Sequence, residues 1–482
     1  MTRPDILIRK KPVIYLYQML DGAYLYDANV DTFIPISMDT YNALQKSISE
    51  SEHGVIRIEQ SDEINQLIQK GFLSEKGVDE LYHPMTDVME VFSQRSLPSI
   101  TLQLTQDCNL RCKYCIYSEE INHNQRSHSK RKMSLETAFK AVDFLYNHSA
   151  DAHRVNIGYY GGEPLLEFAM IKQITEYAEN RFSGKSIGFS ITTNATLLTG
   201  EKYAFMKDHG FSITISMDGD RISHNRNRIF PSGIGSFETV VHNIDNLKGK
   251  YPDISKELSV SSVVDPQNTD IFSSDSLFGD DSIVESLNIN IAFVESDDPS
   301  LSTFSDDFLN KYQLYSFLEL CRVYGKLPEN YRIPILFKKE LERRWYEYST
   351  LGGYVNLPKV GAPSGPCMPG LFRLFIDTNG DFYPCERVSE LSDVMHIGSL
   401  DSGFNYTKMR NLLNVSLLSD GKCKTCPAFR HCGICAKLCD GGDTLSVVNH
   451  NRACKSSLAS FKEQLKFWTL FYKESRLPNL QD

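Results

Sequence analysis

Short apolar runs alternate with amphipathic segments between residues 98 and 325. The runs are rich in β-branched and aromatic residues, as strands are, and each precedes a segment with helical spacing of apolar positions. The strand candidates are 100–105, 155–160, 187–193, 211–216, 258–264 and 288–293. The helix candidates are 134–148, 166–181, 199–209, 236–250, about 270–280 and 304–325. This alternation predicts an α/β fold, a partial (β/α)6 TIM-like barrel whose chemistry lies at the carboxyl ends of the strands.

The first 97 residues predict a separate small unit. Strand-like runs at 12–17 and 22–26 precede helical patterns at 38–49 and 61–71, and no catalytic cluster accompanies them. A small mixed unit without chemistry of its own suits a binding module.

Beyond about residue 350 the regular periodicity fades, and Gly, Pro and Cys become frequent. Such a region has too little continuous apolar pattern to hold itself by packing alone, so bound metal would supply the constraint. We therefore predict three domains, at 1–97, 98–345 and 346–482.

Composition excludes some classes of protein. The 482 residues carry a formal net charge of −10, which argues against broad nucleic-acid binding. We find no apolar stretch long enough to span a bilayer and no signal-peptide pattern near the N-terminus, so we expect a cytoplasmic protein without a membrane partner. Twelve cysteines in a reducing compartment favour metal ligation over disulfides.

Three of the cysteines stand close together, directly after the strand candidate 100–105. Cys108, Cys112 and Cys115 have gaps of three and two residues. Three thiolates on one loop can hold three irons of a cubane cluster and leave the fourth iron open. Zinc is the alternative, but a structural zinc site usually takes four ligands with paired spacing.

This spacing resembles the CxxxCx(aromatic)C motif of the radical S-adenosylmethionine (AdoMet) superfamily, with Tyr114 in the aromatic position. The resemblance implies that a 4Fe–4S cluster binds AdoMet through the open iron. One electron then cleaves AdoMet to a 5′-deoxyadenosyl radical, which takes a hydrogen atom from the substrate.

Further motifs of the superfamily follow the next strand candidates in order. Gly161-Gly162-Glu163-Pro164 resembles the motif that binds the methionine amino group. Two later segments, Thr193-Asn194 and Ser216-Met217-Asp218, resemble motifs that touch the ribose or carboxylate of AdoMet. Arg228 resembles an arginine that pairs with the methionine carboxylate, although Arg226 is close enough to compete for that role.

The later cysteines resemble a SPASM extension, which carries two auxiliary 4Fe–4S clusters. The first half of its pattern is complete, with Gly380 between Cys367 and Cys385. The second half departs from the family, because Cys435 and Cys439 stand where the family usually has one cysteine, which leaves the choice of ligand open; we favour Cys435. With both, eight thiolates could fully ligate two cubanes, whereas with one, a cluster keeps an open iron or a non-cysteine ligand. The resemblance implies an inner cluster on Cys367, Cys385 and one of that pair. It implies an outer cluster on four other cysteines: Cys423, Cys426, Cys432 and Cys454.

Two features of this region keep other interpretations open. Cys423-x2-Cys426 and Cys432-x2-Cys435 also have the spacing of zinc ligands. Glu386 stands where some relatives carry an acidic proton acceptor, which makes it a candidate catalytic residue, and a solvated glutamate would look the same.

The first 97 residues resemble the peptide-recognition element of maturases that act on ribosomally made peptides, a winged-helix-like module that adds the precursor's leader as a strand. The resemblance implies a maturase that cross-links a precursor peptide, for example through a thioether, with flavodoxin or ferredoxin as reductant. One alternative is a sulfatase-maturing type that makes formylglycine. Another is a non-catalytic peptide-binding metalloprotein.

Overall fold

The computed structural model describes most of the chain. The described residues are 6–117, 128–251, 253–254, 258–269, 272, 288–294, 303–328, 330–352 and 356–473. Within them, no helix has the length and apolar character needed to cross a membrane.

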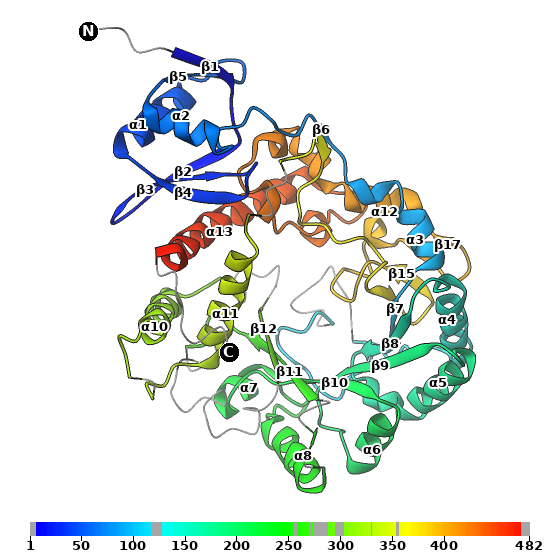
Figure 1. Ribbon diagram of the computed structural model, residues 1–482. Helices are drawn as coiled ribbons and strands as arrows, with labels where there is room; N and C mark the ends of the chain where they lie inside the picture. Colours follow the sequence, from blue (N-terminus) through cyan, green and yellow to red (C-terminus); the bar gives the residue numbers. More distant parts are fainter. Residues whose placement is uncertain are drawn as a thin grey trace.

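Six parallel strands form the centre of the molecule, as the sequence predicts (Figure 1). Each strand pairs with its neighbour in chain order. They are β7 (Ser99–Thr105), β8 (Arg154–Gly161), β9 (Ser186–Thr193), β10 (Phe211–Ser216), β11 (Leu258–Val264) and β12 (Asn288–Phe293). All six strand predictions are confirmed to within one residue at each end. Strands β10, β11 and β12 match the predicted runs, β7, β8 and β9 begin one residue earlier, and β8 also ends one residue later.

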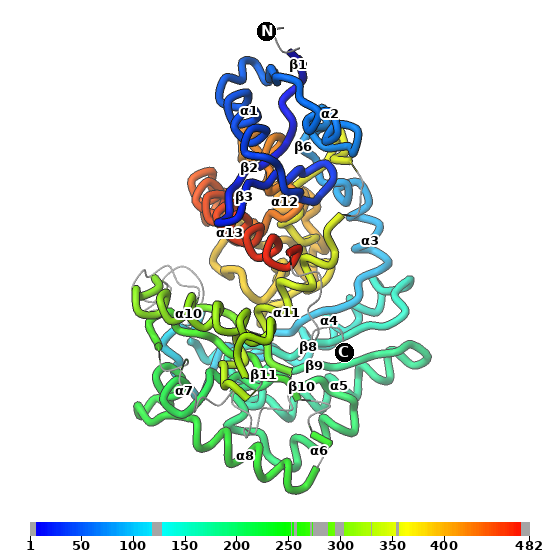
Figure 2. Tube along the Cα trace, turned by 60° about the vertical axis from the view of Figure 1, so that its left-hand side comes forward, coloured from blue at the N-terminus to red at the C-terminus, as the bar shows by residue number. Residues whose placement is uncertain are grey.

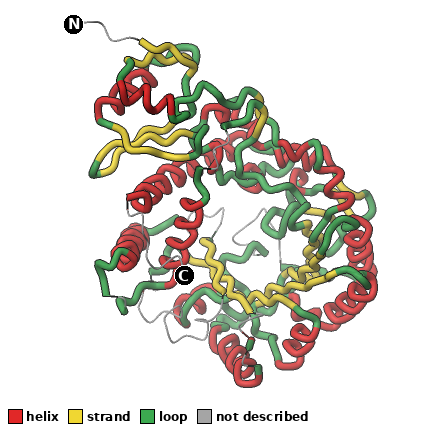
Figure 3. Tube along the Cα trace, viewed as in Figure 1, coloured by secondary structure: helices red, strands yellow, loops and turns green. Residues whose placement is uncertain are grey.

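Helices follow these strands and lie on the outer side of the sheet (Figures 1 and 3). They are α4 (Leu135–His148), α5 (Phe168–Arg181), α6 (Gly200–Asp208), α8 (Phe237–Lys250) and α10 (Asp306–Val323). The prediction missed α7 (Arg221–Asn227) and α11 (Ile335–Ser349). The helix predicted at about 270–280 lies outside the described residues, apart from residue 272. The architecture is therefore an α/β partial barrel.

The alternation of buried positions explains this packing. Alternate residues of β7, namely Ile100, Leu102 and Leu104, are fully buried in the main core. Helix α4 turns the face formed by Ala138, Val142 and Leu145 to the same core, and Ser134 caps its first turn through Thr137 N.

The sheet continues into the C-terminal region, which the sequence did not predict. Strand β14 (Leu374–Ile376) pairs in parallel with β7, on the side away from β8. Three short antiparallel strands then extend the sheet: β15 (Asp381–Tyr383), β16 (Gly398–Ser399) and β17 (Gly403–Phe404). The segment that carries Cys367 and Cys385 is thereby fixed beside the strand that precedes Cys108.

The N-terminal residues form two small antiparallel sheets and two helices. Strand β1 (Ile6–Lys10) pairs with β5 (Val55–Glu59), and β3 (Gly22–Asp27) pairs with both β2 (Ile14–Met19) and β4 (Thr32–Ile36). The helices, α1 (Met38–Ser49) and α2 (Asp62–Gln69), confirm the two predicted helical segments. One face of this unit encloses its own core, around Leu25, Leu44 and Ile58.

The other face of the N-terminal unit packs against a long C-terminal helix, α13 (Val447–Lys473). Figure 2 shows the N-terminal unit, α13 and the barrel in succession. Our expectation that regular periodicity fades beyond residue 350 was wrong for α13, which buries Phe461, Leu465 and Trp468 at helical spacing.

Short elements complete the connections. Strand β6 (Glu80–Leu81) pairs with β13 (Val360–Gly361), so segments from the first and third predicted domains lie side by side. Helix α3 (Met89–Arg95) packs on α4, and α12 (Tyr406–Leu413) follows β17. The domain boundaries near 97 and 345 stay predictions.

Candidate active site

The first three cysteines lie on the loop that follows β7, at the carboxyl end of the sheet. Cys108, Cys112 and Cys115 are all partly buried. Backbone N–H groups turn toward two of the sulfurs, since Leu110 N lies 3.4 Å from Cys108 Sγ and Tyr117 N lies 3.5 Å from Cys115 Sγ. The loop thus presents its thiols at the edge where parallel-sheet enzymes place their chemistry.

The chemistry of these donors suits a cationic metal group. Burial raises the pKa of Cys112 to about 12 and also raises that of Cys108. Such thiols ionise readily only beside metal cations, which is how cysteines ligate iron–sulfur clusters. Within the described residues, no three His, Cys, Asp or Glu side chains are grouped around a point that one metal ion could occupy. Metal analysis decides between iron and zinc.

The two glycines after β8 bring two loops into close backbone contact. Gly162 N donates to Thr105 O at 2.8 Å, and Glu163 N donates to Asp107 O at 2.9 Å. A Cβ at Gly161, whose φ is +136°, would overlap with Thr105 O, and a Cβ at Gly162 would overlap with Asp107 O. Glycine is required here so that the loop can approach the residues immediately before Cys108.

Glu163 binds neighbouring protein groups. Its carboxylate is fully buried and accepts hydrogen bonds from Thr193 Oγ1 at 2.7 Å, Asn194 N at 2.8 Å and Leu165 N at 3.0 Å. Burial raises its pKa, and these hydrogen bonds oppose the rise. Glu163 therefore links the ends of β8 and β9 through hydrogen bonds.

Asn194 extends this hydrogen-bond network to the cysteine loop. Its Nδ2 atom lies 3.8 Å from Cys108 Sγ and donates to Asn109 Oδ1 at 2.9 Å. Its Oδ1 atom accepts from Thr196 N at 3.0 Å. The predicted residues Glu163, Thr193 and Asn194 thus form one polar network with Cys108.

A second network surrounds Cys112 and Tyr114. Arg228 Nε donates to Asp218 Oδ2 at 2.9 Å in a buried ion pair, and the Tyr114 hydroxyl donates to the same oxygen. The guanidinium lies 5.4 Å from the centre of the Tyr114 ring, and its charge opposes the rise in the pKa of Cys112. The structure brings Tyr114, Asp218 and Arg228 together at the cysteine loop.

The competing arginine faces elsewhere. Arg226 Nε donates to Asp265 Oδ2 at 2.9 Å, and its side chain is far more exposed than that of Arg228. Ser216 is the last residue of β10, where it pairs in register with Ser261 of β11, two residues before Asp218. Of the two arginines, only Arg228 lies in the network around Tyr114.

The later cysteines fall into two groups. The first group is Cys367, Cys385 and Cys435. Burial and the Glu386 charge raise the pKa of Cys385 to about 11, and Cys435 and Cys367 make smaller contributions to this rise. Burial and the Cys435 charge likewise raise the pKa of Cys367.

The second group lies where the Cys423 loops meet α13. Burial raises the pKa of Cys426 to about 11, with smaller contributions from Cys423, Cys454 and Cys432. Cys439 is fully buried, and burial, with smaller contributions from Cys435 and Cys432, raises its pKa to about 12, which makes a reactive thiol there unfavourable.

Glu386 lies beside the first of these groups and is held by arginine. Arg373 donates to Glu386 Oε1 at 3.0 Å, and Arg387 is 3.9 Å from the same oxygen. The carboxylate influences both Cys367 and Cys385. The predicted proton acceptor therefore lies at the cysteine group, where its negative charge is balanced by arginine.

Sequence reasoning missed a carboxylate that joins the two cysteine regions. Glu390 accepts hydrogen bonds from Gln103 Nε2 at 2.5 Å and from Gln106 Nε2 at 3.0 Å, and Gln103 also donates to the Tyr117 hydroxyl at 3.0 Å. Gln103 is fully buried on β7, which is costly unless its amide is satisfied. A glutamine in an otherwise apolar strand was the available signal, but nothing in the sequence pointed to its distant partner.

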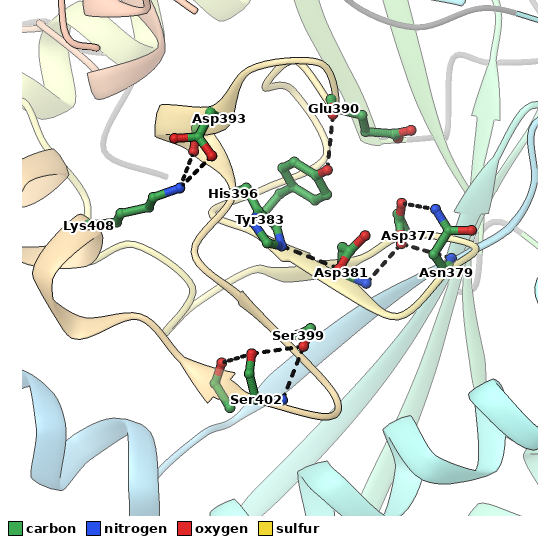
Figure 4. A network of polar contacts seen from close by, with 11 residues as sticks. Asp377, Asn379, Asp381, Tyr383, Glu390, Asp393, His396, Ser399, Ser402 and Lys408 are labelled. Carbon is green, nitrogen blue, oxygen red and sulfur yellow. Dashed lines mark hydrogen bonds and ion pairs between the residues drawn. The ribbon is translucent and has the colours of Figure 1, made fainter. Parts of the chain in front are cut away.

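The loop that carries Glu390 is itself held by polar contacts (Figure 4). The Tyr383 hydroxyl donates to Glu390 O at 3.0 Å, and His396 lies 3.3 Å from Asp381. Asp377 accepts from Asn379 N and Asp381 N in the tight turn where Gly380 has a φ of +94°. Gly380 of the SPASM-like pattern therefore serves the turn that sets up Cys385 and Glu390.

Comparison with known proteins defines the class. Residues 102–270 match the family model described as the radical SAM superfamily, and this range contains the first cysteine loop and the networks around Glu163 and Asp218. The segment that carries the first cysteine loop is therefore similar in sequence to the radical SAM superfamily of enzymes.

The relatives refine that class. The chain is 23% identical over 393 residues to the radical SAM cyclopropyl synthase TigE of Paramaledivibacter caminithermalis, a match that covers 78% of this chain and 76% of TigE. It is 24% identical over 392 residues to a cysteine-type anaerobic sulfatase-maturating enzyme of Clostridium novyi, with 79% of this chain and 98% of that enzyme covered. The solved structure of native anSMEcpe with bound AdoMet has the same fold, with a TM-score of 0.53 at 18% identity over 77% of this chain and 99% of that one.

Replacing Gly162 with alanine tests the loop contact. The new Cβ would overlap with Asp107 O, so Gly162→Ala should displace the cysteine loop and lower the metal content of the protein. Metal content and AdoMet binding measure the effect. Gly200→Ala is the control, because a Cβ there has no neighbour within 4 Å; equal metal content in both variants would contradict the contact's role.

His224 should make stability depend on pH. Burial and the Arg228 charge lower its pKa to about 4, and its Nδ1 atom accepts from Asp218 N while Nε2 faces Ser236 Oγ. The unfolded histidine takes up a proton near pH 6.5, whereas the folded one does so only near pH 4. Stability is therefore complete above pH 6.5 and falls by about 3 kcal/mol as the pH drops to 4.

Denaturant unfolding at several pH values measures this slope. The His224→Gln variant should lose less stability than the native protein between pH 6.5 and 4. The same pH dependence in both proteins would remove His224 as its source.

Proposed function

We propose that this protein is a radical SAM maturase that modifies a precursor peptide. The observation that carries the proposal is the meeting of three partly buried cysteines with the Glu163–Asn194 and Tyr114–Asp218–Arg228 networks at the carboxyl end of the barrel. In this role Cys108, Cys112 and Cys115 hold three irons of a 4Fe–4S cluster. When present, that cluster would bind AdoMet and supply the electron for its cleavage to methionine and a 5′-deoxyadenosyl radical.

The surrounding residues orient this chemistry. Gly161, Gly162 and Glu163 would bind the methionine amino group of AdoMet, and the Thr193 hydroxyl holds the Glu163 carboxylate in place. Asn194 donates a polar hydrogen toward Cys108. Arg228 would pair with the methionine carboxylate, with Asp218 and Tyr114 orienting its guanidinium, and the segment from Ser216 to Asp218 would contact the ribose or carboxylate.

Two further 4Fe–4S clusters are part of the proposal. The inner set is Cys367, Cys385 and Cys435, which influence one another electrostatically. The outer set is Cys423, Cys426, Cys432 and Cys454, with the same kind of mutual influence. Cys439 is assigned a packing role. These clusters would accept an electron from the substrate radical or bind a substrate thiolate, with Glu386 as proton acceptor.

The N-terminal unit is proposed as the peptide-recognition element, a winged-helix-like module. Its sheet has the order β2-β3-β4, so an extended leader peptide can add a strand at an edge. Holding the leader keeps the core peptide near the radical at high effective concentration. Two solved structures of anSMEcpe contain bound AdoMet and a peptide, which supports a peptide as substrate. Cross-linking, for example by a thioether, is the proposed outcome, and flavodoxin or ferredoxin the proposed reductant.

Formylglycine formation is the second candidate function. The chain aligns with 98% of the Clostridium novyi sulfatase-maturating enzyme, which favours this chemistry. That match covers 79% of this chain, and the larger size leaves room for an added recognition unit. Peptide mass and an aldehyde-specific probe together separate the two functions in a co-expressed peptide. A cross-link removes two hydrogens and leaves no aldehyde, whereas formylglycine carries an aldehyde and, when made from cysteine, has also exchanged sulfur for oxygen.

Anaerobic reconstitution tests the proposal. The native protein should bind about twelve irons and form 5′-deoxyadenosine when dithionite is added. Cys112→Ala should abolish this cleavage, whereas Cys423→Ala should retain it and lose product formation. Zinc in place of iron at the first loop, or cleavage by Cys112→Ala, would refute the mechanism.

A matched pair of variants tests which cysteine completes the inner set. Cys435→Ala should lose iron and change the inner cluster's electron paramagnetic resonance (EPR) spectrum, because Cys435 acts on Cys367 and Cys385. Cys439→Ala should keep its iron and lose only packing stability. The reverse result would assign the ligand role to Cys439.

A further inference from the structure

The N-terminal unit forms hydrogen bonds with the loop between Cys426 and Cys432. Arg430 Nε donates to Ala28 O at 2.6 Å, and Arg430 also reaches Asn29 O at 3.3 Å. The next residue, His431, places Nε2 2.6 Å from Asp31 Oδ1. The turn between β3 and β4 therefore contacts two consecutive residues that directly precede Cys432.

Asp31 is built into this turn. Its φ of +48° lies in the left-handed region, and the Tyr26 hydroxyl donates to the same Oδ1 atom at 2.8 Å. Burial alone would raise the pKa of Asp31, but the hydrogen bond and charge of His431 lower it below its usual value. Two partners thus hold the Asp31 carboxylate in one place.

The His431 ring is fixed on its other sides by α13. It stacks on Phe461, with the ring planes 8° apart, and meets Trp468 edge-on at 5.0 Å between ring centres. Tyr26 also packs edge-on against Phe461. Because α13 carries Cys454, one aromatic cluster joins the N-terminal unit to both the Cys432 loop and the Cys454 helix.

The loop is also held on other sides, because Ser364 N donates to Phe429 O at 3.3 Å and Ser364 Oγ donates to Cys432 O at 3.1 Å. Its regular structure within the described residues is one short 3-10 turn, Phe429–His431. A ligand loop of this kind depends on neighbours to orient its thiols, just as partners of metal ligands orient those ligands elsewhere.

We propose that Asp31 and His431 are positioning residues for the outer cysteine set. The N-terminal unit would then orient the loop that carries Cys432, in addition to its proposed role in peptide recognition. This inference rests on the proposed outer cluster. It means that removing the N-terminal unit would damage the outer site directly, since Tyr17, Tyr24 and Tyr26 also cover the core that contains Trp468.

Asp31→Asn tests the inference in the full-length, reconstituted protein. Asparagine tolerates the left-handed backbone and can still accept from Tyr26, so the change removes the charge that orients His431 and little else. Asp21→Asn is the matched control. Asp21 pairs with Lys473 at the far end of α13 from Cys454, so it also links the N-terminal unit to α13 but lies away from the cysteines.

Three measurements are made on each protein: iron per chain, the EPR spectrum of the reduced clusters, and the rate of iron release to a chelator. Asp31→Asn should release the outer iron about tenfold faster and alter the outer spectrum, without changing the AdoMet-dependent signal of the first cluster. Asp21→Asn should behave like the native protein. Tyr26→Phe, which removes the second contact to Asp31, should shift the same signals less.

The outcomes separate this inference from the proposed function. Native behaviour of Asp31→Asn would overturn the positioning role while leaving the outer cluster in place. Equal changes in Asp31→Asn and Asp21→Asn would also overturn it, by showing general loosening of the N-terminal unit. If Cys423→Ala binds as much iron as the native protein, the outer cluster is absent. The outer cluster of the proposed function and the positioning role of Asp31 and His431 then both fail.

Discussion

The close backbone contact between the loops after β7 and β8 is the constraint on which the candidate site depends. Gly162 and Glu163 donate to Thr105 and Asp107, immediately before Cys108. These hydrogen bonds form only because the glycines lack a Cβ, and the buried Glu163 carboxylate then ties the loop to β9. The cysteine loop is held from one side by backbone and from the other by the Arg228–Asp218 pair.

Burying the Arg228–Asp218 ion pair costs desolvation energy and places a cation near the cysteine loop. Isolated charges in a low-dielectric interior are unfavourable, so Asp218 and Arg228 need each other and the Tyr114 hydroxyl to remain buried. The arrangement keeps a cation beside thiols that must become thiolates on binding metal. Electrostatics at this loop are thereby set before any cofactor arrives, which is the usual meaning of a preorganised site.

The C-terminal region is integrated with the barrel and with the N-terminal unit. Strand β14 adds to the sheet beside β7, Glu390 bonds to Gln103 and Gln106, and α13 buries Trp468 under the tyrosines of β2 and β3. The three cysteine sets therefore sit on one connected framework. The N-terminal unit is thereby in continuous packed contact with the Cys432 loop.

The sequence by itself determined the six parallel strands, most of their helices and the cysteine motifs, because periodicity and short spacing are local properties of the chain. Contacts between distant segments were decided by tertiary structure alone. Glu390 meets Gln103 across 287 positions and Asp31 meets His431 across 400, and no local pattern encodes such pairings. The same limit explains why α13 and β14 escaped prediction: their apolar faces become meaningful only against the partners that bury them.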